Sequence, residues 1–223
     1  MSVHEIALRR VLYEIPGMQS VPVRDTEFPG ATGPLPMRIY GHGNEETPVV
    51  LIVFGLPEAR FEEHVGCRFM DMQWTISMAQ LIAASGFTAI THSTRDPEPD
   101  VLALIDHVHE TTSKIGIWAT SANSPVALAV APKVQCAVFN NPITKDFCPD
   151  TPLFIVRAGQ DENPGLNTAL DAFVARALAE DKPLTLVNHR AAPHSYELYL
   201  ETPETRRILQ QGLDFLRAHL SYI

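Results

Sequence analysis

The sequence predicts an α/β fold with a mostly parallel sheet and helices on both of its faces. From about residue 48, short apolar segments alternate with segments whose apolar residues recur at helical spacing, which is the pattern of strand–helix crossovers. The clearest strand segment, Pro48–Phe54, is a continuous apolar run, as expected for a strand covered on both faces. The 223 residues show no internal repeat and no linker, so we expect residues 1–223 to form a single domain.

The expected strands follow one another along the chain. Prolines and glycines are dense between Pro16 and Pro36, which indicates irregular structure or edge strands there. Beyond that region, the apolar runs predict strands at Pro34–Tyr40, Pro48–Phe54, Phe87–Ser93, Lys114–Thr120, Val134–Phe139, Leu153–Arg157 and Pro183–His189.

Helices are expected between these strands and at the end of the chain. Asp100 is read as a helix N-cap, because apolar residues from Val101 to Val108 fall on one helical face. Thr202 is read as the N-cap of the final helix, with Pro203 at its first position. The other predicted helices are Asp71–Ser85, Ser121–Ala131 and Leu166–Leu178.

Composition excludes several classes of partner. The chain is 45% hydrophobic and 19% charged, with a formal net charge of −9 and no Lys/Arg cluster, so we expect no nucleic-acid partner. Met1–Arg10 lacks the apolar core of a secretory signal, and the longest apolar stretch is too short to cross a membrane. The three cysteines are odd in number and lack CxxC spacing, which favours free thiols and a cytoplasmic location.

Ser121 is the main candidate for chemistry. It lies where the predicted strand Lys114–Thr120 turns directly into a helix. A serine in such a sharp turn projects its hydroxyl away from the backbone, beside free N–H groups at a helix N-terminus. This arrangement is typical of a nucleophile elbow.

Asp161 and His194 follow later strands and complete a possible triad. A serine hydroxyl needs a base to remove its proton, and the imidazole needs a carboxylate to fix its tautomer. Asp161 lies just beyond Leu153–Arg157, and His194 follows the last strand. Because carboxyl ends of parallel strands meet at one edge of a sheet, we expect the three side chains to converge.

With these residues in view, the sequence resembles the α/β-hydrolase superfamily, and specifically its small dienelactone-hydrolase-like branch. The resemblance covers roughly Val49 to the C-terminus. It is carried by Ala119-Thr120-Ser121-Ala122-Asn123 at the nucleophile, by Gly159-Gln160-Asp161 at the acid and by Pro193-His194 at the base. It implies a serine hydrolase of the α/β-hydrolase fold without a cofactor or metal.

The chain departs from that family at the elbow. Relatives usually have glycine on both sides of the nucleophile, where this chain has Ala119 and Asn123. Asn accepts unusual backbone angles better than most residues, but it is larger than glycine. Some dienelactone hydrolases use cysteine as nucleophile, so the serine here points to ester hydrolysis in general.

The resemblance also implies an oxyanion hole made of two backbone N–H groups. One is assigned to Ala122, directly after the nucleophile. The second is expected after the strand Val49–Phe54, where Leu56 is the candidate because Pro57 has no N–H.

Alternatives remain open for each site residue. Ser121 could be only a helix N-cap. The acid could instead be Glu162, or a residue after the preceding strand such as Asn140, Asn141 or Asp146. His189 competes with His194 but falls inside a strand, and His107 and His109 are spaced i,i+2, which places them on different helix faces. We therefore expect no metal site.

The expected pocket is open and mainly apolar. About a dozen residues, Asn141–Pro152, join the two strands between which relatives insert a cap, so no cap domain fits. Pro57–Met70 and the loop around His194 are expected to roof the site. Phe61, Phe69, Met70 and Tyr196 are the candidate substrate-binding residues. Arg60 and Arg68 could engage an anionic substrate, but solvated arginines are the default interpretation.

The sequence thus favours a serine hydrolase acting on small-molecule carboxylic esters. Hydrolysis or acyl transfer on thioesters or lactones would use the same three residues. A non-catalytic small-molecule-binding protein of the same fold is the alternative from another class, and Ala119 and Asn123 are the features that favour it. The natural substrate and the oligomeric state do not follow from the sequence.

Overall fold

A single twisted sheet organises the computed structural model, which describes residues 7–43 and 47–221. Residues 1–6, part of the segment Met1–Arg10 discussed above, lie outside these ranges. Within the described ranges, eight strands form the sheet in the order β1-β2-β4-β3-β5-β6-β7-β8. β2 is antiparallel to both of its neighbours, β1 and β4, and all other neighbouring strands are parallel.

The element bounds agree with most of the predicted segments. The strands are β1 (Val23–Gly30), β2 (Gly33–Tyr40), β3 (Val49–Ile52), β4 (Thr88–His92), β5 (Ile115–Thr120), β6 (Cys136–Asn140), β7 (Leu153–Ala158) and β8 (Leu184–His189). The helices are α2 (Glu58–Val65), α3 (Gln73–Ala84), α4 (Pro97–His109), α5 (Ser124–Val130), α6 (Leu166–Ala179) and α7 (Pro203–Leu220).

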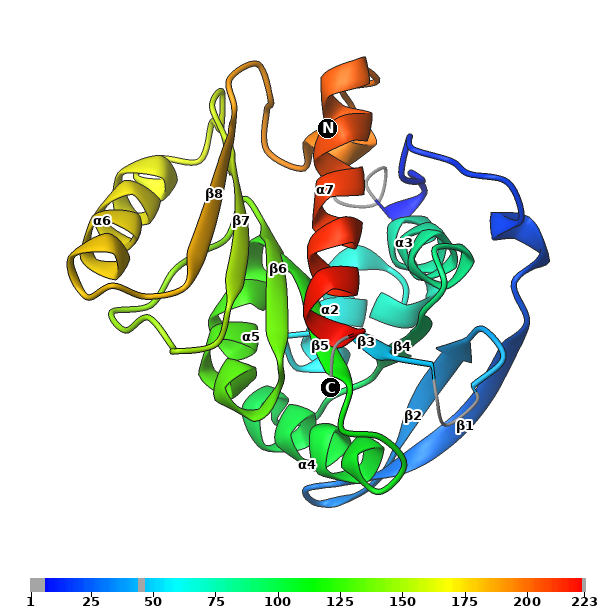
Figure 1. Cartoon of the computed structure of the whole chain (residues 1–223). Helices are drawn as coiled ribbons and strands as arrows, with labels where there is room; N and C mark the ends of the chain where they lie inside the picture. The colour runs from blue at the N-terminus through cyan, green and yellow to red at the C-terminus, as the bar shows by residue number, and fades with distance from the viewer. Residues whose placement is uncertain (1–6, 44–46, 222–223) are drawn as a thin grey trace.

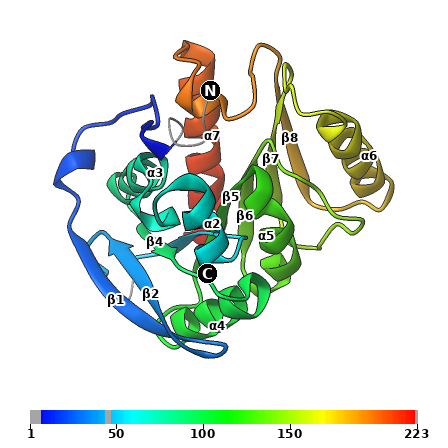
Figure 2. The same ribbon diagram turned by 180° about the vertical axis from the view of Figure 1, so that it is seen from behind.

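The apolar core is divided by the sheet into two layers. Side chains of a strand point alternately to its two faces, so Val50 and Ile52 of β3 pack on one face while Val49 and Leu51 pack on the other. The first layer is closed by α3 and α7, which lie in front of the sheet in Figure 1. The second is closed by α4, α5 and α6, of which α4 and α5 lie in front in Figure 2. The predicted fold class, a mostly parallel sheet with helices on both faces, is confirmed.

The region of dense prolines and glycines contains β1, an edge strand paired with β2 in a hairpin, which agrees with one of the two expectations for that region. Two details differ from the prediction. The segment expected only to roof the site contains the helix α2. Helix α4 begins at Pro97 after the N-cap Asp96, so the reading of Asp100 as N-cap is wrong.

Asp100 instead lies one turn inside α4 and reaches back. Its carboxylate is fully buried and accepts the amides of Arg95 and Asp96 at 2.7 and 2.8 Å, and that of Ala31 at 2.9 Å. An acidic side chain that bonds back to amides before the helix satisfies donors that the helix leaves open. The N-cap role of Thr202 is confirmed, because its hydroxyl accepts the Thr205 amide at 3.1 Å.

The connections after β5, β7 and β8 position the site. The segment 141–152 between β6 and β7 holds neither helix nor strand, in agreement with the expected absence of a cap. In the described part of the chain, no helix is both long and apolar enough to cross a membrane.

Candidate active site

Ser121 occupies a constrained turn at the carboxyl end of β5. Thr120 is extended, with φ −136°, and Ser121 then adopts φ 52°, a left-handed conformation that non-glycine residues rarely take. A short 3₁₀ turn, Ser121–Asn123, leads into α5. A strained backbone angle at this place gives the serine hydroxyl its direction away from the sheet.

Asp161 follows β7 with a completely buried side chain. Its Oδ1 accepts hydrogen bonds from the amide and the side-chain NH₂ of Asn163, at 3.0 and 2.9 Å. Its Oδ2 lies 2.6 Å from His194 Nδ1. The carboxylate is therefore held from both sides and directed at the imidazole.

His194 lies between the acid and the serine. Its Nε2 is 2.8 Å from Ser121 Oγ, and its side chain is 23% exposed. A carboxylate only accepts hydrogen bonds, so the contact with Asp161 assigns the proton to Nδ1 and leaves the lone pair of Nε2 facing the serine hydroxyl. This tautomer can remove a proton from Ser121.

The turn that carries Asp161 and the loop that carries His194 are bonded to each other. The Gly159 amide donates to the His189 carbonyl at 2.9 Å, and the Gln160 amide donates to the Ala192 carbonyl at 2.8 Å. A Cβ on Gly159 would lie 2.5 Å from the Arg190 carbonyl oxygen, so glycine is required for this close approach. The relative position of Asp161 and His194 is thus fixed by backbone contacts.

The two candidate oxyanion donors lie beside Ser121. Leu56 and Ala122 line the same cavity as Ser121. Neither backbone N–H donates a hydrogen bond to any of the residues that the structure describes. Two free amides next to the Ser121 hydroxyl are suited to stabilise a negatively charged oxygen.

Alanine and asparagine fit at the elbow. Ala119 is buried in the core layer on the α5 side. Asn123 has φ −80° and ψ −19°, ordinary helical angles, so its tolerance of unusual backbone conformations is not used. The residue with the unusual angle is Ser121.

The cavity beside Ser121 measures about 200 Å³ and is mainly apolar. Its walls include Phe61 and Phe69, as expected. Further lining residues come from α2, from the start of α3 with the residue before it, and from the segment after His194, namely Val65, Met72, Trp74, Ser195, Glu197 and Leu198. A second cavity of about 340 Å³ lies against Ser121 and includes Ile143, Pro164 and Leu166.

Met70 and Tyr196 do not line either cavity, contrary to expectation. Both side chains are fully buried. The Tyr196 hydroxyl donates to Asn140 Oδ1 at 3.0 Å, and its ring packs against His189. A pattern of apolar residues near a site cannot distinguish a core side chain from a cavity wall, and this is why the two were misplaced.

Sequence reasoning missed two polar residues at the site. Asn163 orients Asp161, and its position two residues after an aspartate is a signal that could have indicated it. Glu197 is fully buried in the wall of the smaller cavity, where it accepts a hydrogen bond from Trp74 Nε1 at 3.1 Å. Burial raises the pKa of this carboxyl. No local pattern indicates that contact, because the two residues are 123 positions apart.

The alternative site residues make other contacts. His189 is buried with Nε2 3.0 Å from Thr205 Oγ1, and burial lowers its pKa. Asn140 Oδ1 accepts a hydrogen bond from the Tyr196 hydroxyl. The carboxylate that bonds to His194 Nδ1 is that of Asp161. His107 pairs with Glu110, whereas His109 contacts the Lys133 carbonyl. Over the described residues, no group of three or more His, Cys, Asp or Glu side chains is arranged to hold a metal ion.

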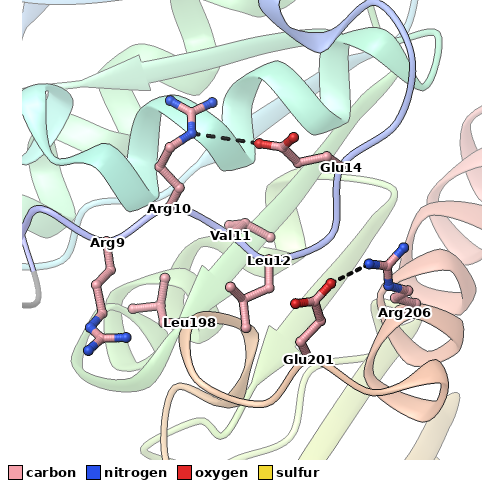
Figure 3. A pocket seen from close by; sticks show the side chains of 8 residues that line it. All are labelled: Arg9, Arg10, Val11, Leu12, Glu14, Leu198, Glu201 and Arg206. Atoms are coloured by element: carbon pink, nitrogen blue, oxygen red, sulfur yellow. Dashed lines mark hydrogen bonds and ion pairs between the residues drawn. The ribbon is translucent and has the colours of Figure 1, made fainter.

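A larger cavity of about 540 Å³ lies between the N-terminal segment and the start of α7 (Figure 3). Its charged side chains pair with each other: Arg10 with Glu14 at 3.8 Å and Arg206 with Glu201 at 2.5 Å. Arg9 lies over the ring of Tyr199. The residues that line this cavity include no nucleophile with a base beside it, so it is not the candidate active site.

Solved structures with a similar fold include several esterases. An esterase from Pyrobaculum calidifontis matches with a TM-score of 0.67 at 14% identity, over 90% of this chain and 88% of that chain. The esterase LipW from Mycobacterium marinum matches with a TM-score of 0.69 at 14% identity, over 99% and 95%. The chain has the α/β-hydrolase fold.

The same fold also occurs in an enzyme named as a peptidase. Dipeptidyl peptidase 4 from Porphyromonas gingivalis matches with a TM-score of 0.70 at 13% identity, over 90% of this chain and 36% of that chain. No family model matches this sequence, and no curated protein matches it either. At these identities the likeness concerns the fold, and the reaction has to be argued from the site.

Proposed function

We propose that this chain is a serine hydrolase that cleaves small carboxylic esters through an acyl-enzyme intermediate. The observation that carries the proposal is the continuous line of contacts from Ser121 Oγ through His194 to Asp161, at 2.8 and 2.6 Å. Such a line is what a nucleophile, a base and an orienting acid require. Several of the structural neighbours are named as esterases, and the motifs favour the small dienelactone-hydrolase-like branch.

The reaction follows from the positions of the hydrogen-bonding groups. His194 Nε2 takes the proton of Ser121 as Oγ attacks the ester carbonyl, and Asp161 stabilises the resulting imidazolium. The carbonyl oxygen, now negatively charged, accepts hydrogen bonds from the amides of Leu56 and Ala122. His194 then gives its proton to the departing alcohol, which leaves an acyl group on Ser121.

Water completes the cycle. His194 removes a proton from a water molecule as its oxygen attacks the acyl carbonyl, and the proton returns to Ser121 Oγ when the carboxylic acid leaves. Phe61 and Phe69 offer apolar contact to the substrate in the smaller cavity. Thioesters and lactones would react by the same steps, so they are outcomes of a substrate survey rather than a separate mechanism.

A serine substitution with a matched control tests the proposal. We expect Ser121→Ala to lower kcat/KM for p-nitrophenyl acetate by about a thousandfold or more, because the other groups cannot act without the nucleophile. Ser113→Ala, at an exposed serine before β5, should leave the rate unchanged. A serine-directed phosphonate should label Ser121, as located by mass spectrometry. Equal background rates for wild type and Ser121→Ala would instead indicate a binding protein.

We also propose that the chain forms one domain and resides in the cytoplasm. All eight described strands belong to one sheet. Cys67, Cys136 and Cys148 are free thiols, which is typical of a reducing compartment. The proposed substrate is a small molecule, and we propose no nucleic-acid or membrane partner.

A further inference from the structure

Three side chains, two at or just after the end of β4 and one in the elbow after β5, hold the turn that follows β3. The Phe54 amide donates to His92 Nε2 at 3.1 Å. The Gly55 amide donates to Asn123 Oδ1 at 2.9 Å. The Leu56 carbonyl accepts from Thr94 Oγ1 at 2.6 Å. Three backbone groups of consecutive residues are thus fixed, while the Leu56 amide has no partner within the described residues.

Asn123 connects this turn to the nucleophile elbow. A Cβ on Gly55 would lie 2.9 Å from the Asn123 Cα and 3.0 Å from its carbonyl oxygen, so the two backbones are in direct contact there. Each candidate oxyanion donor is the sequence neighbour of one member of this pair: Leu56 follows Gly55, and Ala122 precedes Asn123. The Gly55–Asn123 contact therefore sets the spacing of the two donors.

We propose that Asn123 is a positioning residue of the oxyanion site, whose side-chain oxygen holds the turn after β3 so that the Leu56 amide faces the carbonyl that Ser121 attacks. This inference rests on the proposed ester hydrolysis. His92 and Thr94 support the same turn from the other side of β3, because His92 is the last residue of β4 and Thr94 lies two residues beyond it.

The amide of asparagine suits this position chemically. Its oxygen accepts the Gly55 N–H without placing a negative charge beside an oxygen that becomes anionic during the reaction. Aspartate would provide a similar acceptor, but its charge would repel the developing oxyanion. Glycine, the residue usual in relatives at this place, has no side chain to hold the turn.

The effect of losing this contact should appear in the transition state. A misplacement of about 1 Å at a reacting centre can cost about a hundredfold in rate, and complete loss of an oxyanion donor costs about 100- to 1,000-fold. We therefore expect Asn123→Ala to lower kcat for p-nitrophenyl acetate about tenfold to a hundredfold. KM should stay within about twofold, because the ester carbonyl is uncharged in the ground state.

An inhibitor that mimics the charged intermediate separates positioning from a general structural effect. A short alkyl trifluoromethyl ketone adds to Ser121 Oγ, the proton passes to His194, and the ketone oxygen becomes the anion in the oxyanion site. Its inhibition constant should rise by the same factor by which kcat falls in Asn123→Ala. Asn123→Asp should lower kcat and raise the inhibition constant as strongly as Asn123→Ala. Asn188→Ala, at an exposed asparagine on β8, should have the kcat and the inhibition constant of wild type.

Each outcome decides the inference. Parallel losses in kcat and inhibitor affinity support it, whereas an unchanged kcat, a change in KM alone or an unchanged inhibition constant overturns it. If Asn123→Ala does not fold, Thr94→Val removes a second contact of the same turn while keeping side-chain shape, and must show the same parallel loss. If wild type is no faster than Ser121→Ala, the proposed function itself fails. An active wild type with an equally active Asn123→Ala refutes only the positioning role.

Discussion

The hydrogen bond between the Phe54 amide and His92 depends on the protonation state of the imidazole ring. His92 is completely buried at the end of β4, where Nε2 accepts the Phe54 amide and Nδ1 lies 3.3 Å from the Ser93 carbonyl. Burial lowers the pKa of His92 to about 4. Nε2 can accept a hydrogen bond only in the neutral ring, so protonation would break the contact with the turn after β3.

This arrangement predicts a defined dependence of stability on pH. The folded pKa of His92 lies below the unfolded value of about 6.5, so the unfolded chain binds more protons between these values. The contribution of neutral His92 is present above about pH 6.5 and is lost as pH falls towards 4. From the size of the shift we expect a loss of about 3 kcal/mol in the free energy of unfolding.

His92→Gln tests that expectation, because a glutamine oxygen can accept the same amide without titrating. Urea unfolding at pH 7 and pH 4.5 should show a smaller pH effect in the variant than in wild type. The pKa of His189 is also lowered by burial, so the stability of both proteins still depends on pH. The test is therefore whether the pH effect on the free energy of unfolding is smaller in His92→Gln than in wild type. Equal pH effects would contradict the role of His92.

Individual site residues were predictable to different degrees. Ser121, Asp161 and His194 each follow a strand whose apolar sequence is easily recognised. Because the carboxyl ends of parallel strands lie at one edge of the sheet, their convergence could be predicted. Asn163, Glu197 and the Gly55–Asn123 contact were not predicted. Except for Asn163, they depend on contacts between segments distant in sequence, which leave no local pattern.

Among the elements, the paired turns after β7 and β8 are the most sensitive to a small change. In Gly159→Ala the added methyl group would meet backbone atoms of Arg190, which cannot rotate away. We expect a loss of about 1–3 kcal/mol in stability and a fall in kcat of about tenfold or more, because Asp161 and His194 would separate.

Gly116→Ala provides the matched control for that loss. The nearest atoms to the new methyl group on β5 all belong to side chains: the ends of Leu216 and Leu220, at 3.0 and 3.1 Å, and Cys136 Sγ at 3.5 Å. Those side chains can move, so we expect a loss in stability with little change in kcat. Similar kcat values for the two alanine variants would contradict the coupling of the two turns.

Helix α7 depends on the hydroxyl at its start. The Thr202 side chain accepts the Thr205 amide, and Thr205 in turn contacts His189. Thr202→Ala should cost about 1 kcal/mol, which corresponds to a Tm lower by about 2–4 °C for a chain of this size. Thr185→Ala, at an exposed position on β8, should leave Tm unchanged. Calorimetry of both variants measures the difference.

Elements buried on both sides were the easiest to predict. Strands β3 to β7 are buried along almost their whole length because helices cover both of their faces, and their sequences are therefore rich in apolar residues. Strand β1 was not located because Phe28 is its one buried residue. Helix α2 was missed because half of its residues are charged and it buries only Glu58 and Val65, which gives no apolar stripe.

At the scale of the whole molecule, the division of the core by the sheet determines how the thiols react. Cys136 is buried in the layer under α3 and α7, and burial raises its pKa to about 12. Cys148 is buried in the other layer with a raised pKa, and Cys67 is only partly covered.

We therefore expect iodoacetamide at pH 8 to modify native protein slowly and only at Cys67, because a thiol must be exposed and ionised to react. Unfolding in urea should make all three cysteines reactive. Mass spectrometry of native and unfolded samples measures the number of adducts. Rapid modification of Cys136 in the native protein would show that the layer under α7 opens readily.

The irregular link at 141–152 has a consequence for how the chain could be divided. The proposed nucleophile, Ser121, and the turn after β3 precede it, whereas the proposed acid and base, Asp161 and His194, follow it. A protein cut within this link would yield two fragments with complementary, individually inert halves of the chemistry. They could regain turnover only by restoring the pairing of β6 with β7, so recovered hydrolysis would report the assembly of the sheet itself.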